Sequence, residues 1–149
     1  EGEKSGLSFA GKDGKERRAK VSVFKFLPSS VFALVLQENH DEEGLNWPAE
    51  VSPFQVHLIS LGNNEEIIHA AKNIYQKLGE AGFDVLWDDR DKKPGVKFND
   101  ADLLGFPIKI VLGSNFLNKQ EIELEERGSN KKKFVKSNEL IDKLVAFFS

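Results

Sequence analysis

The side chains with the greatest capacity for chemistry lie in one charged loop, Asp88–Phe98, which reads Asp-Asp-Arg-Asp-Lys-Lys-Pro-Gly-Val-Lys-Phe. Its three carboxylates fall within four residues, and carboxylate oxygens are ligands that Mg²⁺ prefers. Arg90, Lys92 and Lys93 stand among them, and their positive charges would oppose a further cation. A simpler interpretation pairs Arg90 with one of the two carboxylates before it, which would fix the loop. We therefore expect no metal site here.

The end of this loop also suits recognition of an anion or a nucleobase. Pro94 and Gly95 are typical of a helix start, where backbone N–H groups and the positive end of the helix dipole point outward. Lys97 and Phe98 follow one turn into that helix, where they would supply a charge and an aromatic face for stacking. The pattern favours binding of a ligand over catalysis.

The remaining polar residues do not form a convincing catalytic or metal-binding set. The three adjacent residues His40-Asp41-Glu42 resemble ligands, but neighbours in a loop rarely converge on one ion. His57 and His69 lie in a predicted strand and a predicted helix, which favours packed or surface roles. Ser29-Ser30 has no G-x-S-x-G context, and the chain has neither a P-loop nor a G-x-G-x-x-G motif. We expect a binding module with no catalytic residue.

Composition fits one ordinary soluble domain, or one domain with an appendage. The chain has 149 residues, of which 40% are hydrophobic and 30% charged, and it contains no Cys, which excludes disulfides and thiol catalysis. A net charge of −3 excludes a bulk polyanion binder, although basic clusters at 12–20 and 127–136 are compatible with RNA contact at one surface. No membrane-length apolar run or signal peptide is visible, so we expect no membrane partner. The absence of Cys fits a reducing compartment, and we expect a cytoplasmic protein, with an organellar location left open.

The N-terminal third reads as an appendage. Asp13-Gly14 predicts a hairpin turn between strands at Leu7–Ala10 and Ala19–Leu27. Val31–Glu38 is an apolar run that fits either a helix or a strand. Residues 39–53 hold two prolines and a glycine and read as a connection, so we predict a boundary between regions 1–38 and 39–149.

From Phe54 onward the pattern predicts an α/β fold. Asn63 resembles the cap of a helix that Gly82 ends. Further helices are predicted at Pro94–Leu104 and Asn138–Phe148. Apolar runs and alternating residues predict five strands, at Phe54–Leu61, Phe83–Asp88, Phe106–Leu112, Glu121–Arg127 and Lys131–Lys136. We expect a mixed, largely parallel five-stranded sheet flanked by three helices. The binding crevice should lie beyond the C-terminal ends of the parallel strands, at 62–64, 88–94 and 113–118.

Two parts of the chain resemble a known family. The first is Asn39–Pro48 with Val51–Ile59, and the second is Asp88–Asp91 through Pro94–Phe98 with Asp100–Pro107. Both are similar to the anticodon-binding domain of bacterial-type prolyl-tRNA synthetases. The Trp-Pro junction and the Arg-Asp…Pro-Gly-Val-Lys-Phe motif distinguish this family from the threonyl-, histidyl- and glycyl-tRNA synthetases, which share the fold.

The resemblance implies that the domain grips the anticodon of proline tRNA, whose second and third bases are guanines. The RNA-binding candidates carried over by position are Arg90, Lys93, Lys97, Phe98 and Asp102. Arg90 and Lys97 would donate to guanine O6 or N7, or to phosphate. Asp102 would accept from guanine N1–H and N2–H, and Phe98 would either stack on a base or belong to the core.

Residues 7–16 resemble the end of the catalytic domain of the same family. The third class II motif should follow, but its glycines would fall on Ser22, Lys25 and Leu27 and its Arg on Ser30. We therefore expect no cofactor in this chain, although the resemblance implies a parent proline–tRNA ligase that uses ATP and Mg. That parent would be a homodimer in which a catalytic domain partners this one.

Three interpretations remain open at this stage. The chain is the tRNA-binding end of a prolyl-tRNA synthetase, as a fragment or a catalytically dead relative. Alternatively, it is an accessory module that binds proteins and has lost RNA contact, which the apolar stretch Val21–Leu36 favours weakly. The third interpretation is an active synthetase in which Ser22–Ser30 is an aberrant segment.

Overall fold

The computed structural model describes residues 7–19, 24–129 and 131–149. The chain divides into two compact units, Glu1–Ala33 and Leu34–Ser149. This division falls inside helix α1 (Pro28–Glu38). The apolar run Val31–Glu38, whose pattern fits either a helix or a strand, is therefore helical. No residue of α1 is buried. The predicted domain boundary after Glu38 stays a prediction.

The first unit contains a small antiparallel hairpin. Strands β1 (Ser8–Ala10) and β2 (Glu16–Arg18) pair with each other, and Gly14 takes a positive φ of 73° in the turn. The predicted hairpin is confirmed, but its second strand was placed too late in the sequence. Of the predicted strand Ala19–Leu27, residues 24–27 have no regular structure and residues 20–23 lie outside the described residues.

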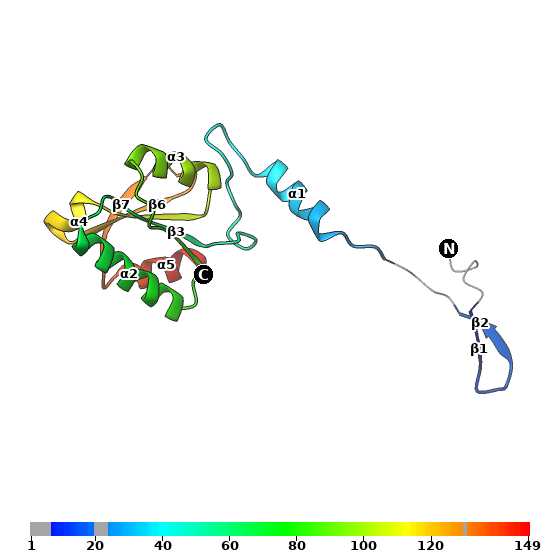
Figure 1. Ribbon diagram of the computed structural model, residues 1–149. Helices are drawn as coiled ribbons and strands as arrows, with labels where there is room; N and C mark the ends of the chain where they lie inside the picture. Colours follow the sequence, from blue (N-terminus) through cyan, green and yellow to red (C-terminus); the bar gives the residue numbers. More distant parts are fainter. Residues whose placement is uncertain (1–6, 20–23, 130) are drawn as a thin grey trace. The chain divides into compact units, whose positions relative to one another are not determined.

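The second unit is built on a five-stranded sheet in the order β4-β3-β5-β6-β7 (Figure 1). Strand β3 pairs in parallel with both β4 and β5, whereas the β5–β6 and β6–β7 pairs are antiparallel. The predicted mixed sheet is confirmed, with as many antiparallel as parallel pairs. The strands are β3 (Val56–Ser60), β4 (Val85–Asp88), β5 (Ile108–Leu112), β6 (Glu121–Glu126) and β7 (Lys132–Lys136).

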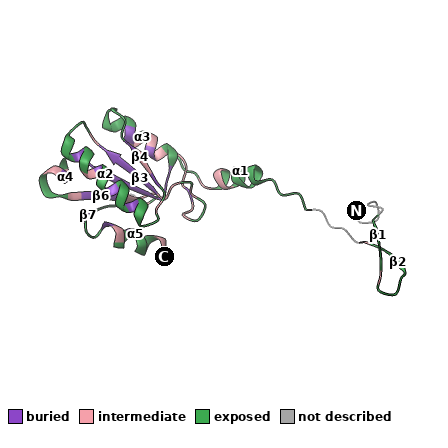
Figure 2. Ribbon diagram, turned by 60° about the horizontal axis from the view of Figure 1, so that its bottom comes forward, coloured by how far each residue is buried: buried purple, intermediate pink, exposed green. Residues whose placement is uncertain are grey.

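Helices cover the two faces of this sheet unequally. Helices α2 (Glu65–Glu80) and α5 (Leu140–Phe148) lie on one face, and α3 (Pro94–Leu104) lies on the other (Figure 1). The large core lies under α2 and α5, whereas α3 covers a small cluster of Ile59, Ala101 and Val111. Side chains alternate between the faces along each strand, which is why charged residues can share strands with a dense core. Figure 2 shows burial concentrated on the central strands.

Two details of the helices differ from the sequence-based expectation. Helix α2 is capped by Asn64, whose side chain accepts from the Glu66 N–H at 2.8 Å, and not by Asn63. A fourth helix, α4 (Ser114–Lys119), follows β5 where a loop was expected, and it buries Phe116. With six residues, α4 is too short to show a helical repeat in the sequence.

Candidate nucleic-acid interface

Arg90 is held rigidly at the C-terminal end of β4. Its Nε and Nη2 atoms donate to the two carboxylate oxygens of Asp88 at 2.9 and 2.7 Å, and Nη2 also donates to Asp100 Oδ2 at 2.8 Å. The Arg90 N–H bonds Asp88 Oδ1 at 3.1 Å. These bonds hold the pKa of Asp88 below its usual value and raise the pKa of Arg90. The pairing expected from the sequence is confirmed, and Asp88 is the partner.

The Arg90 side chain remains available despite these ion pairs. It is 48% exposed, and no described residue accepts a hydrogen bond from Nη1. A guanidinium carries two N–H groups on that atom. Two carboxylates therefore fix the plane of the group while its outer donors face solvent.

Lys97 points into the protein instead of toward solvent. Its side chain is 2% exposed, and Nζ donates to the backbone oxygens of Ser60 at 2.7 Å and Asp88 at 3.1 Å. The ammonium also lies 3.7 Å from Asp88 Oδ1. Lys97 therefore ties α3 to the ends of β3 and β4. The expected contact of its ammonium with guanine or phosphate has no geometric support, because all of its hydrogen-bond and ion-pair partners among the described residues lie inside the protein.

Lys93 and the first residues of α3 are exposed to solvent. Lys93 is exposed, has no ion pair with any described residue, and occupies the N-cap position without a side-chain cap. Pro94 stands at the first position of the helix, as predicted. This end of α3 combines a cationic side chain with the positive end of the helix dipole, which suits an anion.

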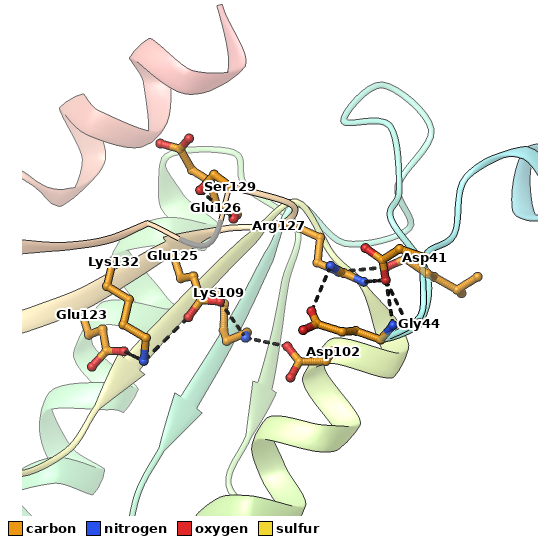
Figure 3. Close-up of polar contacts among 12 residues, drawn as sticks. Asp41, Gly44, Asp102, Lys109, Glu123, Glu125, Glu126, Arg127, Ser129 and Lys132 are labelled. Atoms are coloured by element: carbon orange, nitrogen blue, oxygen red, sulfur yellow. Dashed lines mark hydrogen bonds and ion pairs between the residues drawn. The ribbon is translucent and has the colours of Figure 1, made fainter.

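A second group of charges covers the sheet face beside α3 (Figure 3). Asp102 accepts from Lys109 Nζ at 2.7 Å, and Lys109 also reaches Glu125 at 3.2 Å. Lys132 Nζ lies 2.6 Å from Glu123 and 3.9 Å from Glu125. The hydrogen bond to Glu123 raises the pKa of Lys132. We call these five residues the polar face.

Phe98 lies between the small core and the polar face. It is half-buried and packs against the cluster of Ile59, Ala101 and Val111. The ammonium groups of Lys109 and Lys132 lie 6.0 and 5.9 Å from the centre of its ring. Phe98 thus belongs partly to the core, while its ring also lies beside two cations, the buried Lys109 and the exposed Lys132.

Sequence reasoning found only one member of the polar face, Asp102. The missed residues had a signal, because Ile122 and Leu124 were predicted to point inward, which places Glu123 and Glu125 on the opposite face. Lys109 is likewise the charged residue within an apolar strand. The sequence does not show the register of β6 against β5 and β7. This register pairs Val111 with Glu123 and Glu125 with Lys132, and it brings the charged side chains together.

The connection before β3 is locked onto the C-terminal end of α3. The Trp47 indole N–H donates to the Leu104 carbonyl at 3.0 Å, and Arg127 donates to the Leu45 carbonyl at 3.0 Å. Arg127 also bonds Asp41 at 2.6 Å, which holds the pKa of Asp41 below its usual value (Figure 3). At Gly105, with φ of 64°, a Cβ atom would lie 1.6 Å from the Leu45 oxygen, so only glycine fits.

The described residues contain no group of three or more His, Asp or Glu side chains arranged to hold a metal ion. Among the same residues, no helix combines the length and apolar character needed to cross a lipid bilayer.

Comparison with known proteins places this fold. A family model described as anticodon binding domain matches residues 55–147. The chain belongs to that family. The chain is 37% identical over 145 residues to a proline–tRNA ligase of Thermodesulfovibrio yellowstonii, covering 92% of this chain and 25% of the ligase. It is 40% identical over 140 residues to a proline–tRNA ligase of Geobacter sp., covering 93% of this chain and 24% of the ligase.

The fold also matches solved structures. Prolyl-tRNA synthetase from Cryptosporidium parvum, complexed with halofuginone and AMPPNP, aligns with a TM-score of 0.82 and 22% identity over 99% of this chain and 31% of that chain. At this identity the match shows the fold. The predicted resemblance to prolyl-tRNA synthetases and the predicted fold class are confirmed. This chain spans about a quarter of the length of its ligase relatives.

Proposed function

We propose that this domain binds the anticodon loop of proline tRNA as part of a prolyl-tRNA ligase. The observation that carries the proposal is the rigid Arg90, whose Nη1 donates to no described residue and which lies three residues before the exposed Lys93 at the start of α3. A guanidinium held in one plane loses little freedom when it binds, which favours a specific contact through the two Nη1 N–H groups over a loose one.

Arg90 would read a guanine and Lys93 would position its phosphate. Nη1 of Arg90 can donate to O6 or N7 of guanine, and a good base contact discriminates by about 1–3 kcal/mol. A lysine at a helix N-terminus attracts phosphate without reading the base. Recognition of the two anticodon guanines therefore combines one sequence-reading donor with one positioning charge.

The polar face would complete this site. Phe98 offers the exposed part of its ring for stacking, and Asp102 can accept guanine N–H groups when Lys109 turns to Glu125. The ammonium groups of Lys109 and Lys132 then remain paired with Glu125 and Glu123. Exchange of ion-pair partners in this way lets a base bind without leaving a buried charge alone.

The parent protein would be an ATP- and Mg-dependent proline–tRNA ligase of the cytoplasm. Its catalytic domain would be the partner of this domain, and the enzyme would be a homodimer. The identity of 37–40% to two proline–tRNA ligases supports this part of the proposal. The chain itself contains no catalytic residue in our proposal.

The direct test compares binding of proline tRNA with binding of a version in which both anticodon guanines are replaced. We expect a clear preference for the natural RNA, and loss of roughly 5- to 150-fold in affinity for that RNA with Arg90→Ala. Lys93→Ala should lower the affinity for both RNAs by the same factor. Lys72→Ala, an exposed lysine on α2 at the opposite face, is the matched control. All affinities must be measured at one stated salt concentration.

A second candidate function is an accessory module that binds another protein. It is favoured by large apolar side chains that lie exposed, since Phe26 is 72% and Leu34 58% exposed. Equal binding of both RNAs, or no binding at low salt, would favour this candidate over RNA recognition.

A further inference from the structure

Strand β7 forms one edge of the five-stranded sheet, because the strand order ends there. Along an antiparallel strand, successive residues direct their backbone N–H and C=O groups to opposite sides. The Arg127 N–H donates to the Pro107 carbonyl at 2.9 Å, so the odd-numbered residues of β6 bond β5 and the even-numbered residues bond β7. The register then leaves the backbone groups of Lys132, Phe134 and Lys136 pointing out of the sheet. We call these groups the β7 edge.

The β7 edge is open to a further strand. The Lys136 carbonyl accepts from the Glu139 N–H at 3.0 Å, and no described residue bonds the other outward N–H and C=O groups. Phe134, in the middle of the edge, is 50% exposed. A row of unpaired backbone groups on an exposed edge strand can pair with an extended segment of another chain.

A groove of about 330 Å³ lies beside this edge, between β7 and α5. Its floor includes the buried side chains of Leu124, Val135 and Leu144, and Phe147 of α5 lines it while remaining 40% exposed. Side chains of a strand alternate between the two faces of a sheet, so every second side chain of an added strand would lie on the side where the groove is. The groove therefore suits a strand with apolar side chains at alternate positions.

The charges around the β7 edge are mostly positive and are not neutralised within the domain. Lys131, Lys136 and Lys143 are exposed and form no ion pair with any described residue. Glu126, which lines the groove, is already paired with Lys133. The edge is therefore complementary to a segment that carries carboxylates.

The inner neighbour of β7 shows which kind of sequence pairs with this strand. Strand β6 reads Glu-Ile-Glu-Leu-Glu-Glu, and its Ile122 and Leu124 are buried in the large core. On its other face, Glu123 accepts from Lys132 Nζ at 2.6 Å. A segment with the same alternation would present carboxylates to the lysines on the open side of β7 and apolar side chains to the groove. A second copy of β7 fits poorly, because lysines would then lie opposite lysines.

We propose that the β7 edge binds an extended acidic segment of a partner protein, in which carboxylates alternate with apolar side chains. The segment adds to the sheet as a further strand and forms backbone hydrogen bonds with Lys132, Phe134 and Lys136. Its apolar side chains fill the groove beside α5. This inference is independent of RNA recognition, which we place at Arg90 and the first residues of α3.

Hydrogen exchange of the whole chain tests the inference with a synthetic peptide as the probe. The peptide carries the β6 sequence Glu-Ile-Glu-Leu-Glu-Glu with both ends blocked. At a peptide concentration ten times the Kd, exchange of the outward amides of Lys132, Phe134 and Lys136 should slow about tenfold. The amides of Lys133 and Val135 already bond β6 and are the internal control. Unchanged exchange at the outward amides with about 1 mM peptide would overturn the inference.

Variation of the peptide tests the groove. Replacement of its Ile and Leu by Ser should lower the affinity at least about tenfold, because burial of each apolar side chain contributes about 1.5–3 kcal/mol. Equal affinity of the two peptides would show that the apolar side chains remain outside the groove, which contradicts the inference.

A charge reversal on the protein tests the edge itself. Lys136→Glu should lower the affinity for the acidic peptide at least about twofold, because a carboxylate would then lie opposite the lysine's former partner. Lys72→Glu makes the same change in net charge on an exposed residue of α2 and is the matched control, with unchanged affinity expected. The same loss in both variants would indicate general attraction between charges and would overturn binding at this edge.

Two other occupants are distinguished by the same exchange measurement. Protection of the outward amides by an oligouridylate, and not by the peptide, would assign the lysines to RNA phosphates and overturn the inference. Protection that increases with the concentration of the chain alone would instead assign the edge to a second copy. Protection by the peptide alone supports the inference.

Discussion

The two faces of the central sheet use the same strands but carry different kinds of side chain. One face is covered by α2 and α5 and forms the large core. The other is crossed by α3 alone. A cleft lined by His57, Arg90 and Leu104 lies on one side of that helix, and the polar face lies on the other. The contrast shows how a small domain separates stability from recognition, because alternate residues of one strand serve each purpose.

Loss of the buried ammonium should have the largest effect, and it tests whether the α3 face also contributes to stability. Lys97→Met keeps the side-chain length but removes the buried donor of the Ser60 carbonyl and one of the two cations beside the buried Asp88 carboxylate. We expect unfolding free energy to fall by about 3–5 kcal/mol in urea denaturation. Lys93→Met, on the exposed lysine of the same loop, should change it by less than about 0.5 kcal/mol. Equal stability of the two variants would contradict an internal role for Lys97.

A cavity on the covered face should cost a similar or slightly smaller amount. Leu144 is fully buried in α5, and Leu144→Ala should destabilise the domain by about 2–5 kcal/mol. Its preference for proline tRNA over the guanine-free RNA should not change below the melting temperature. A changed preference would show that the two faces are coupled. Exposed Lys143→Ala, one residue earlier in the helix, is the control.

The contribution of the buried His57 imidazole to stability should be measurable from the pH dependence of the free energy of unfolding. The folded-state pKa of His57, about 4, lies below the unfolded value of about 6.5, so the unfolded chain binds a proton first as the pH falls. Stability should therefore decrease from about pH 6.5 and level off near pH 4, by about 3 kcal/mol in total. His57→Phe should remove this decrease. The lowered pKa of Asp88 adds a further loss only below about pH 3.9, which both proteins share.

The smallest effect is expected on the polar face. Lys132 is 54% exposed, so Lys132→Ala should change stability by no more than about 1 kcal/mol. If RNA lies over this face, the slope of log affinity against log salt should become less steep by about 0.7. The same slope in Lys132→Ala and wild type would place the RNA phosphates elsewhere.

The core elements were predictable because their sequence patterns are repetitive. The continuous apolar run of β3 and the helical repeat of Ile67, Ala71, Ile74 and Leu78 identify a covered strand and its covering helix. Pro94 and Gly105 mark both ends of α3. The six residues of α4 carry no repeat long enough to detect.

The candidate site was harder to predict because it depends on direction and register. The sequence shows Lys97 one turn into a helix but not that its side chain runs inward to the ends of β3 and β4. It shows acidic residues along β6 but not their partners on β5 and β7. The buried Nδ1 of His57, which has no hydrogen-bond partner among the described residues, is visible only when its surroundings are known, since a histidine in an apolar strand is ordinarily a packed residue.

The lock at the C-terminal end of α3 has a mechanical consequence. Trp47 and Leu45 are bonded to the last turn of α3, and Gly105 leaves no gap between the two segments. An α-helix of 11 residues is a stiff rod about 16 Å long. A displacement of the chain at Trp47 would therefore move the whole rod, including Lys97 and Asp100, which hold the Asp88–Arg90 pair.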